Sequence, residues 1–88
     1  RRVDVAFVHN LFEVGIAIEA LLARRCAERI DAAGIAALEA AQDDYEALAR
    51  REAFGQLVGA NRAFHDMMNR AARNPEATAT LDRHWQLI

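Results

Sequence analysis

One short stretch decides how this chain folds: Ala60-Asn61-Arg62-Ala63-Phe64-His65-Asp66. At about 100° per residue, Asn61 and His65 share one face of a helix with the apolar residues Phe54, Val58, Met68 and Ala72. This pattern predicts a helix over about residues 52–72 with a buried apolar face. A polar group on such a face costs about 1–3 kcal/mol unless it has a partner. The partner of Asn61 and His65 is therefore the functional question.

Three further helices are predicted around this stretch. Asp4 is a suitable N-cap for a long helix with apolar residues mostly three and four apart: Val5, Val8, Leu11, Phe12, Ile18, Leu22, Cys26 and Ile30. Asp31 can cap a second, outer helix, and Arg50-Arg51-Glu52 indicates the turn that follows it. Asn74-Pro75-Glu76 predicts a fourth helix beginning at Pro75, with Ala77, Leu81, Trp85 and Ile88 on one side.

Composition supports an all-α chain and limits its partners. The 88 residues are rich in Ala, Leu, Arg and Glu, and include only four Gly and one Pro. We therefore expect one domain, a compact antiparallel bundle of about four helices. The net charge of -2, with acidic and basic residues interleaved, argues against direct contact with nucleic acid.

The expected compartment is the cytoplasm. Cys26 is the only cysteine, so the chain cannot form an internal disulfide. Neither a signal peptide nor a continuous apolar run of about 18 residues is evident, so no membrane contact is expected. The chain opens without Met and closes with a helical pattern still running, which suggests a fragment of a longer protein.

Gly15 and Glu19 repeat the same anomaly on the first helix, where they fall at the centre of the apolar face. A glycine inside a helix costs about 1 kcal/mol relative to Ala. Gly15 therefore suggests a close helix crossing or space for a bound molecule. Glu19 can pair with a buried Arg, accept a hydrogen bond from His65, or line a polar cavity between the first and third helices.

Asn61 and His65 lie one helical turn apart, so both side chains can reach one point and hold a metal ion. An imidazole with an oxygen donor suits Zn, Ni, Mn or Fe, but a protein site usually needs three or four ligands. The alternative is that the two side chains hydrogen-bond each other or the backbone within the core. His9 and His84, near the polar edges of their helices, are not expected to be ligands.

Catalysis has little support in the sequence. We find no Gly-rich phosphate loop, CxxC, HExxH or nucleophile elbow, and no Ser–His–acid arrangement is evident. A metalloenzyme would need a catalytic base and an open coordination position that this sequence does not show. We therefore expect a binding protein rather than an enzyme.

Two motifs resemble the FCD domain, the effector-binding domain of the FadR subfamily of GntR transcription regulators. The run Leu11-Phe12-Glu13-Val14-Gly15-Ile16-Ala17-Ile18-Glu19, with Ala23 and Cys26-Ala27-Glu28-Arg29 after it, looks like the first helix of that domain. The run Asn61-Arg62-Ala63-Phe64-His65, followed by Ala71-Ala72-Arg73-Asn74-Pro75, resembles its acid-or-amide, Phe-His and Asn-Pro pattern. Order and spacing agree over essentially the whole chain.

This resemblance implies a helical bundle around a small organic acid, often beside a divalent metal such as Zn, Ni or Mn. Asn61 and His65 would be two metal ligands, and two further His would come from later helices. Gly15, Glu19, Asn61 and His65 would line the effector site. Two departures are Gly15, where the family commonly has an Arg that engages the ligand, and Asn61, where Asp is frequent.

The function implied is ligand sensing in a bacterial transcription regulator. A homodimer is expected, with DNA bound by a winged-helix domain N-terminal to Arg1, while residues 1–88 form part of the sensing domain. The alternative is a helical dimerisation module in which Asn61, His65 and Glu19 form a satisfied polar network without a ligand.

Overall fold

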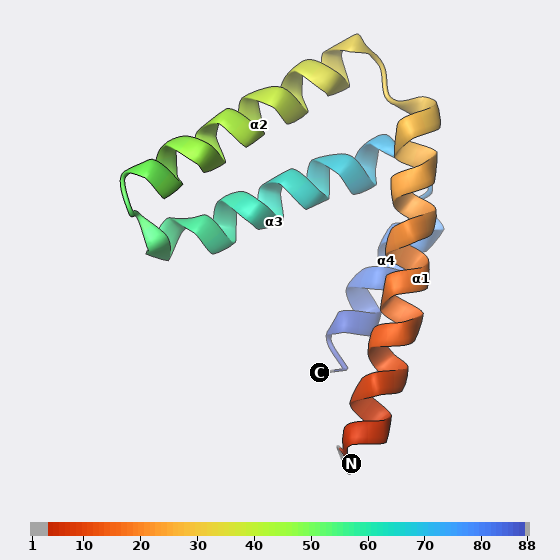
Figure 1. The fold of residues 1–88 in the computed structure, drawn as a ribbon. Coiled ribbons are helices and arrows are strands. Elements are labelled where there is room, and N and C mark those ends of the chain that lie inside the picture. Colours follow the sequence, from red (N-terminus) through yellow and green to blue (C-terminus); the bar gives the residue numbers. More distant parts are fainter. Residues whose placement is uncertain (1–3, 88) are drawn as a thin grey trace.

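The computed structural model describes residues 4–87 and shows four helices without a strand in that range (Figure 1). They are α1 (Val5–Arg29), α2 (Ala32–Arg50), α3 (Phe54–Ala71) and α4 (Pro75–Trp85). The all-α prediction is confirmed. The fourth helix ends at Trp85, so the helical pattern does not continue through Leu87, and the predicted position of Ile88 lies outside the described residues.

The three predicted N-caps are present. The side-chain oxygens of Asp4 and Asp31 accept hydrogen bonds from the backbone N–H of Phe7 and Gly34, each at 2.8 Å. Asn74 accepts from the N–H of Ala77 at 3.0 Å and precedes Pro75. These side chains satisfy N–H groups that the first turn of a helix cannot pair internally.

Helix α3 begins differently, without a side-chain cap. Glu52, in the preceding turn, adopts a positive φ of 56°, and the helix begins two residues later at Phe54. The predicted turn at Arg50-Arg51-Glu52 is therefore correct, with the start of the helix shifted by two residues.

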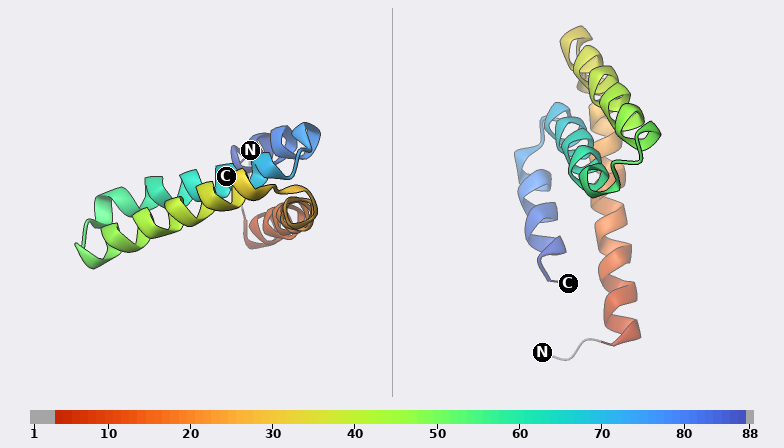
Figure 2. Two further views of the ribbon diagram at one scale, coloured as in Figure 1. Left: turned by 90° about the horizontal axis from the view of Figure 1, so that it is seen from above. Right: turned by 90° about the vertical axis from the view of Figure 1, so that its left-hand side faces the viewer.

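The four helices form two antiparallel pairs that diverge from one junction. Helices α1 and α4 make one arm, and α2 and α3 make the other (Figures 1 and 2). The radius of gyration is 15.0 Å, compared with about 12 Å for a compact domain of this length. The helices pair in antiparallel fashion, but the pairs are α1 with α4 and α2 with α3, and they do not gather into one compact bundle. Helices α1 and α2 are joined by a short loop but do not pack against each other, so loop length alone does not decide which helices become neighbours.

The core lies at the junction, where the C-terminal halves of α1 and α3 meet the beginning of α4. Leu22, Cys26, Ala72 and Leu81 are buried together there. The guanidinium of Arg29 adds a polar tie, because Nη1 donates to the carbonyl oxygen of Ala72 at 2.8 Å, at the C-terminal end of α3. The junction is therefore the part of the molecule that fixes the two arms relative to each other.

Helix α1 is long and apolar enough to cross a membrane, with a mean hydropathy of 1.7 in its most apolar window. The sequence analysis looked for a continuous apolar run of about 18 residues, and this helix is not such a run because it contains charged residues. One such helix is weak evidence for a membrane span, because core helices of soluble proteins have the same length and composition.

Candidate functional site

Helix α3 presents Asn61 and His65 to solvent. The expectation that they lie on a buried face is wrong within residues 4–87, because the apolar residues of the same stripe are also uncovered: Phe54 is 64% exposed and Val58 77%. Only the end of the stripe, at Met68 and Ala72, enters the junction core.

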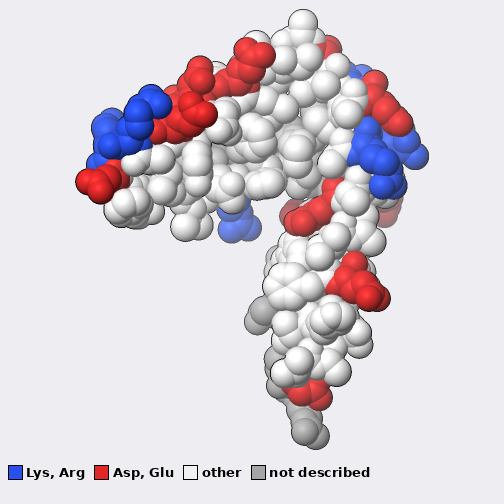
Figure 3. Space-filling view, in the orientation of Figure 1, with Lys and Arg blue, Asp and Glu red and all other residues white. Residues whose placement is uncertain are grey.

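A neighbouring face of α3 is partly buried instead. Its residues recur three and four apart: Leu57, Ala60, Phe64, Met68 and Ala71. Both faces of α3 are apolar, so periodicity alone could not show which one the other helices would pack against. In the view of Figure 3, charged side chains gather on the outer side of α2, while the underside of the α2–α3 arm is largely uncharged.

The side chains of Asn61 and His65 are not used by the fold. They line a hollow of about 200 Å³ with Gln42, Tyr45 and Phe64. Within residues 4–87, neither side chain forms a hydrogen bond or an ion pair, and the ring of His65 only meets that of Phe64 edge-on at 5.9 Å. The expected alternative of a satisfied polar network is therefore absent from the described chain.

Two metal donors are available here, the amide oxygen of Asn61 and a ring nitrogen of His65. Their spacing on a regular helix allows both to approach one ion. No group of three His, Cys, Asp or Glu that could hold a metal occurs in the described residues. The pair therefore fits part of a coordination sphere.

Gly15 is explained by a close helix crossing. It is buried, and a Cβ atom built there would collide with the indole ring of Trp85 from α4. The same ring packs against Phe12 at a centroid distance of 5.4 Å. Of the two predicted explanations for Gly15, the close crossing is the one observed, and Trp85 fills the space next to it.

Glu19 is exposed on α1 and joins no ion pair or hydrogen bond in the part of the chain that the structure describes. The predicted contact with His65 is not formed, and no buried Arg approaches the carboxylate. The structure therefore brings Asn61 and His65 together, but brings neither Gly15 nor Glu19 into contact with them.

His84 lies in the core, contrary to its expected place at a polar edge. Its side chain is only 9% exposed, and Nε2 donates a hydrogen bond to the carbonyl oxygen of Leu11 at 2.6 Å. A carbonyl can only accept, so Nε2 carries a proton. Its spacing, three residues after Leu81 and seven after Ala77, was the sequence signal for this buried position.

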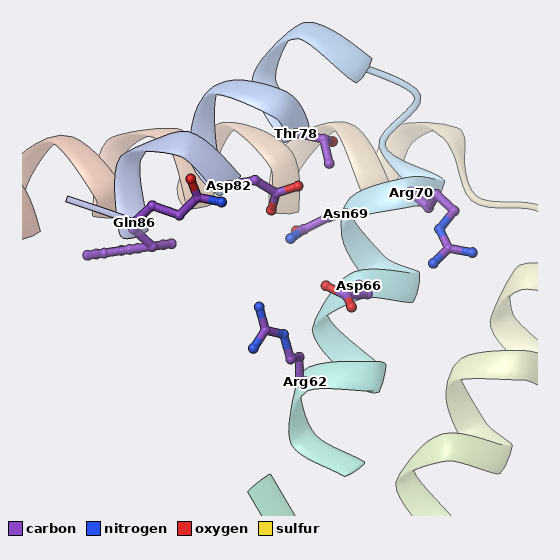
Figure 4. Close-up of a pocket in the computed structure, with 8 residues that line it drawn as sticks. Arg62, Asp66, Asn69, Arg70, Thr78, Asp82 and Gln86 are labelled. Atoms are coloured by element: carbon purple, nitrogen blue, oxygen red, sulfur yellow. The ribbon is translucent and has the colours of Figure 1, made fainter. Parts of the chain in front are cut away.

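A larger hollow, which sequence reasoning missed, lies between α3 and α4 (Figure 4). Its volume is about 660 Å³, and seven polar side chains line it together with Trp85: Arg62, Asp66, Asn69, Arg70, Thr78, Asp82 and Gln86. The sequence shows Arg62, Asp66 and Asn69 three and four residues apart, on one side of the predicted third helix. That spacing was the available signal, but only the position of α4 shows that this face of α3 lines a hollow.

Comparison with known proteins identifies the family. A family model described as the FCD domain matches residues 10–88. No curated protein and no solved structure matches the chain. The match covers most of the sequence, so the chain belongs to the FCD domain family. It is thus a ligand-binding module of the kind found in GntR-family regulators, and such modules have regulatory rather than enzymatic roles.

Proposed function

We propose that this FCD domain senses a small organic acid beside a divalent metal, and thereby controls DNA binding by a winged-helix domain on its N-terminal side. The observation that carries the proposal is the pair Asn61 and His65, exposed on α3 and unpaired within residues 4–87, in a chain that the FCD model matches. A cytoplasmic homodimer is part of the same proposal.

Asn61 and His65 would supply the first two ligands of the metal. Zn, Ni or Mn suits an imidazole with an oxygen donor, and the remaining ligands would come from groups outside the described residues. A bound metal would supply positive charge for an effector carboxylate. This matters because Gly15 cannot supply it, whereas the family commonly has an Arg at that position.

Glu19 and Gly15 would have different parts in such a site. The exposed carboxylate of Glu19 is free to accept a hydrogen bond from an effector hydroxyl. Gly15 would contribute shape alone, because its missing side chain lets the Trp85 indole lie against α1.

The junction offers a route from effector to DNA-binding domain. Helices α1 and α3 are connected there by the Leu22 core and by the hydrogen bond from Arg29 to the end of α3. An effector that prefers one arrangement of the arms shifts the population toward it, by no more than its difference in affinity for the two arrangements.

A helical dimerisation module without a ligand is the second candidate. It is favoured by the large apolar side chains exposed on α1, among them Val5, Phe12, Val14 and Ile16. The polar network that accompanied this alternative is not formed in residues 4–87. Exposed apolar residues would also be covered in a sensing homodimer, so the two candidates differ only in their response to ligands.

The test measures the affinity of the intact regulator for DNA upstream of its own gene by fluorescence anisotropy. Zinc chloride is added alone and with citrate, malate or lactate. We expect at least one acid to change the Kd about 5-fold to 150-fold, and His65→Ala to abolish this change. His9→Ala, another exposed histidine, is the matched control. An unchanged Kd under all conditions would favour the dimerisation module.

A further inference from the structure

The hollow between α3 and α4 is lined by charged side chains that the fold leaves unused. Arg62, Asp66 and Asp82 all line it, and none forms an ion pair or hydrogen bond with another residue in the range 4–87. Opposite charges can pair on a protein surface, where a pair typically contributes about 0–1 kcal/mol. Here they face a shared space instead (Figure 4).

The charges occupy different sides of that space. Figure 4 shows the Asp82 carboxylate reaching in from α4 and the Arg62 guanidinium from the opposite side, on α3. Asp66 and the amide of Asn69 lie between them. Arg70 also lines the hollow, but its guanidinium turns away from the centre. The centre of the hollow therefore offers one cation and two carboxylates at separate positions.

This arrangement selects against ligands of a single charge. An anion near Arg62 meets two carboxylates, and a cation near Asp66 and Asp82 meets a guanidinium. A molecule with both an ammonium group and a carboxylate can satisfy both sides with charge-assisted hydrogen bonds. The indole of Trp85 adds an apolar wall, held in place from behind by Phe12 and by the crossing at Gly15.

We propose that the α3–α4 hollow binds a zwitterionic small molecule of the amino-acid class, with its carboxylate at Arg62 and its ammonium at Asp66 and Asp82. The volume of about 660 Å³ is within the usual range for small-molecule sites and leaves space for a side chain against Trp85. This site uses neither Asn61 nor His65, so it goes beyond the proposed metal and organic-acid site.

The test is isothermal titration of the intact protein with zwitterions, after a thermal-shift screen of the twenty amino acids and the dipeptide Gly-Phe. L-Phenylalanine provides a matched set, because L-phenylalaninamide keeps only the ammonium and N-acetyl-L-phenylalanine only the carboxylate. We expect at least one zwitterion to bind, and its singly charged derivatives to bind at least about tenfold more weakly.

Variants test which side chain binds the carboxylate of the ligand and which binds its ammonium group. Arg62→Gln and Asp82→Asn should each weaken binding of the zwitterion about tenfold, and Arg62→Gln should leave binding of the ammonium-only derivative unchanged. Arg70→Gln is the matched control, because that side chain points away, and circular dichroism checks that all variants remain helical. The absence of binding by every zwitterion, equal binding of a singly charged derivative, or insensitivity to both variants would overturn the proposal. His65→Ala tests the metal site alone and should leave this binding intact.

Discussion

The two arms of the molecule use their apolar residues differently. The α1–α4 arm and the junction contain every buried core side chain of the described residues, whereas α2 has no buried residue. The α2–α3 arm is amphipathic, yet it leaves Phe54 and Val58 uncovered. An apolar stripe on a helix therefore shows which face can be buried. Whether another helix packs against that face, and which one, depends on how the other helices are arranged.

Leu22→Ala should have the largest effect on stability, because the side chain is fully buried in the junction. We expect the free energy of unfolding to fall by about 2–5 kcal/mol, through lost burial and the cavity left behind. Urea unfolding followed by circular dichroism measures this. Val58→Ala is the control from the other arm and should change stability by less than about 0.5 kcal/mol. Equal losses in both variants would show that the arms are equally packed.

Gly15→Ala should destabilise the chain by about 1–3 kcal/mol, because the added methyl group collides with Trp85. Gly59→Ala is the matched change in the other arm, where nothing lies within 4 Å of the new Cβ atom. That variant should stabilise the chain by about 1 kcal/mol through helix propensity. Thermal unfolding compares the two, and Trp85→Ala should remove the penalty at position 15. A stabilising Gly15→Ala in the original background would contradict the close crossing.

Arg29→Ala should cost about 1 kcal/mol, since it removes the hydrogen bond to the carbonyl of Ala72 that joins α1 to the end of α3. Amide hydrogen exchange should rise most at the C-terminal turn of α3. Arg24→Ala, on an exposed position of the same helix, should leave exchange there unchanged. An equal rise in hydrogen exchange in both variants would show that the hydrogen bond from Arg29 to Ala72 is not the cause.

Glu28 should show the smallest effect, and only as a change of pKa. The hydrogen bond from Arg25, at 2.7 Å, lowers the pKa of its carboxyl below the ordinary value. The folded pKa is depressed, so the small stabilisation is present above the ordinary pKa and is lost as pH falls through the folded one. Arg25→Gln should raise the pKa of Glu28 in an NMR titration. No movement would show that the pair is not formed in solution.

Local signals in the sequence predicted the helices well. Asp4, Asp31 and Asn74 are caps because their short side chains reach N–H groups within one turn, and such a contact does not depend on the rest of the fold. Spacing placed Asn61 and His65 on the same face of the third helix, but its prediction that this face is buried was wrong. In the function that we propose, they are available to a ligand because no hydrogen bond or ion pair within residues 4–87 uses them.

Contacts between helices could not be predicted in the same way. His84 was assigned to an edge because its polarity outweighed its spacing, yet the carbonyl of Leu11 supplies a buried partner. Arg62 and Asp82 are 20 residues apart and line opposite sides of one hollow only because the loop before Pro75 turns α4 back along α1. A helical wheel describes one helix at a time and carries no information about such pairs.

The central claim is that the exposed pair on α3 binds a metal, and metal stoichiometry tests it most directly. Isothermal titration of the metal-free intact protein with zinc, nickel and manganese chlorides would be compared for the parent, Asn61→Ala, His65→Ala and His9→Ala. We predict one site per chain, with the affinity lowered at least tenfold in the first two variants and retained in His9→Ala. Absence of metal binding in the parent, or equal binding in all four proteins, would contradict the account.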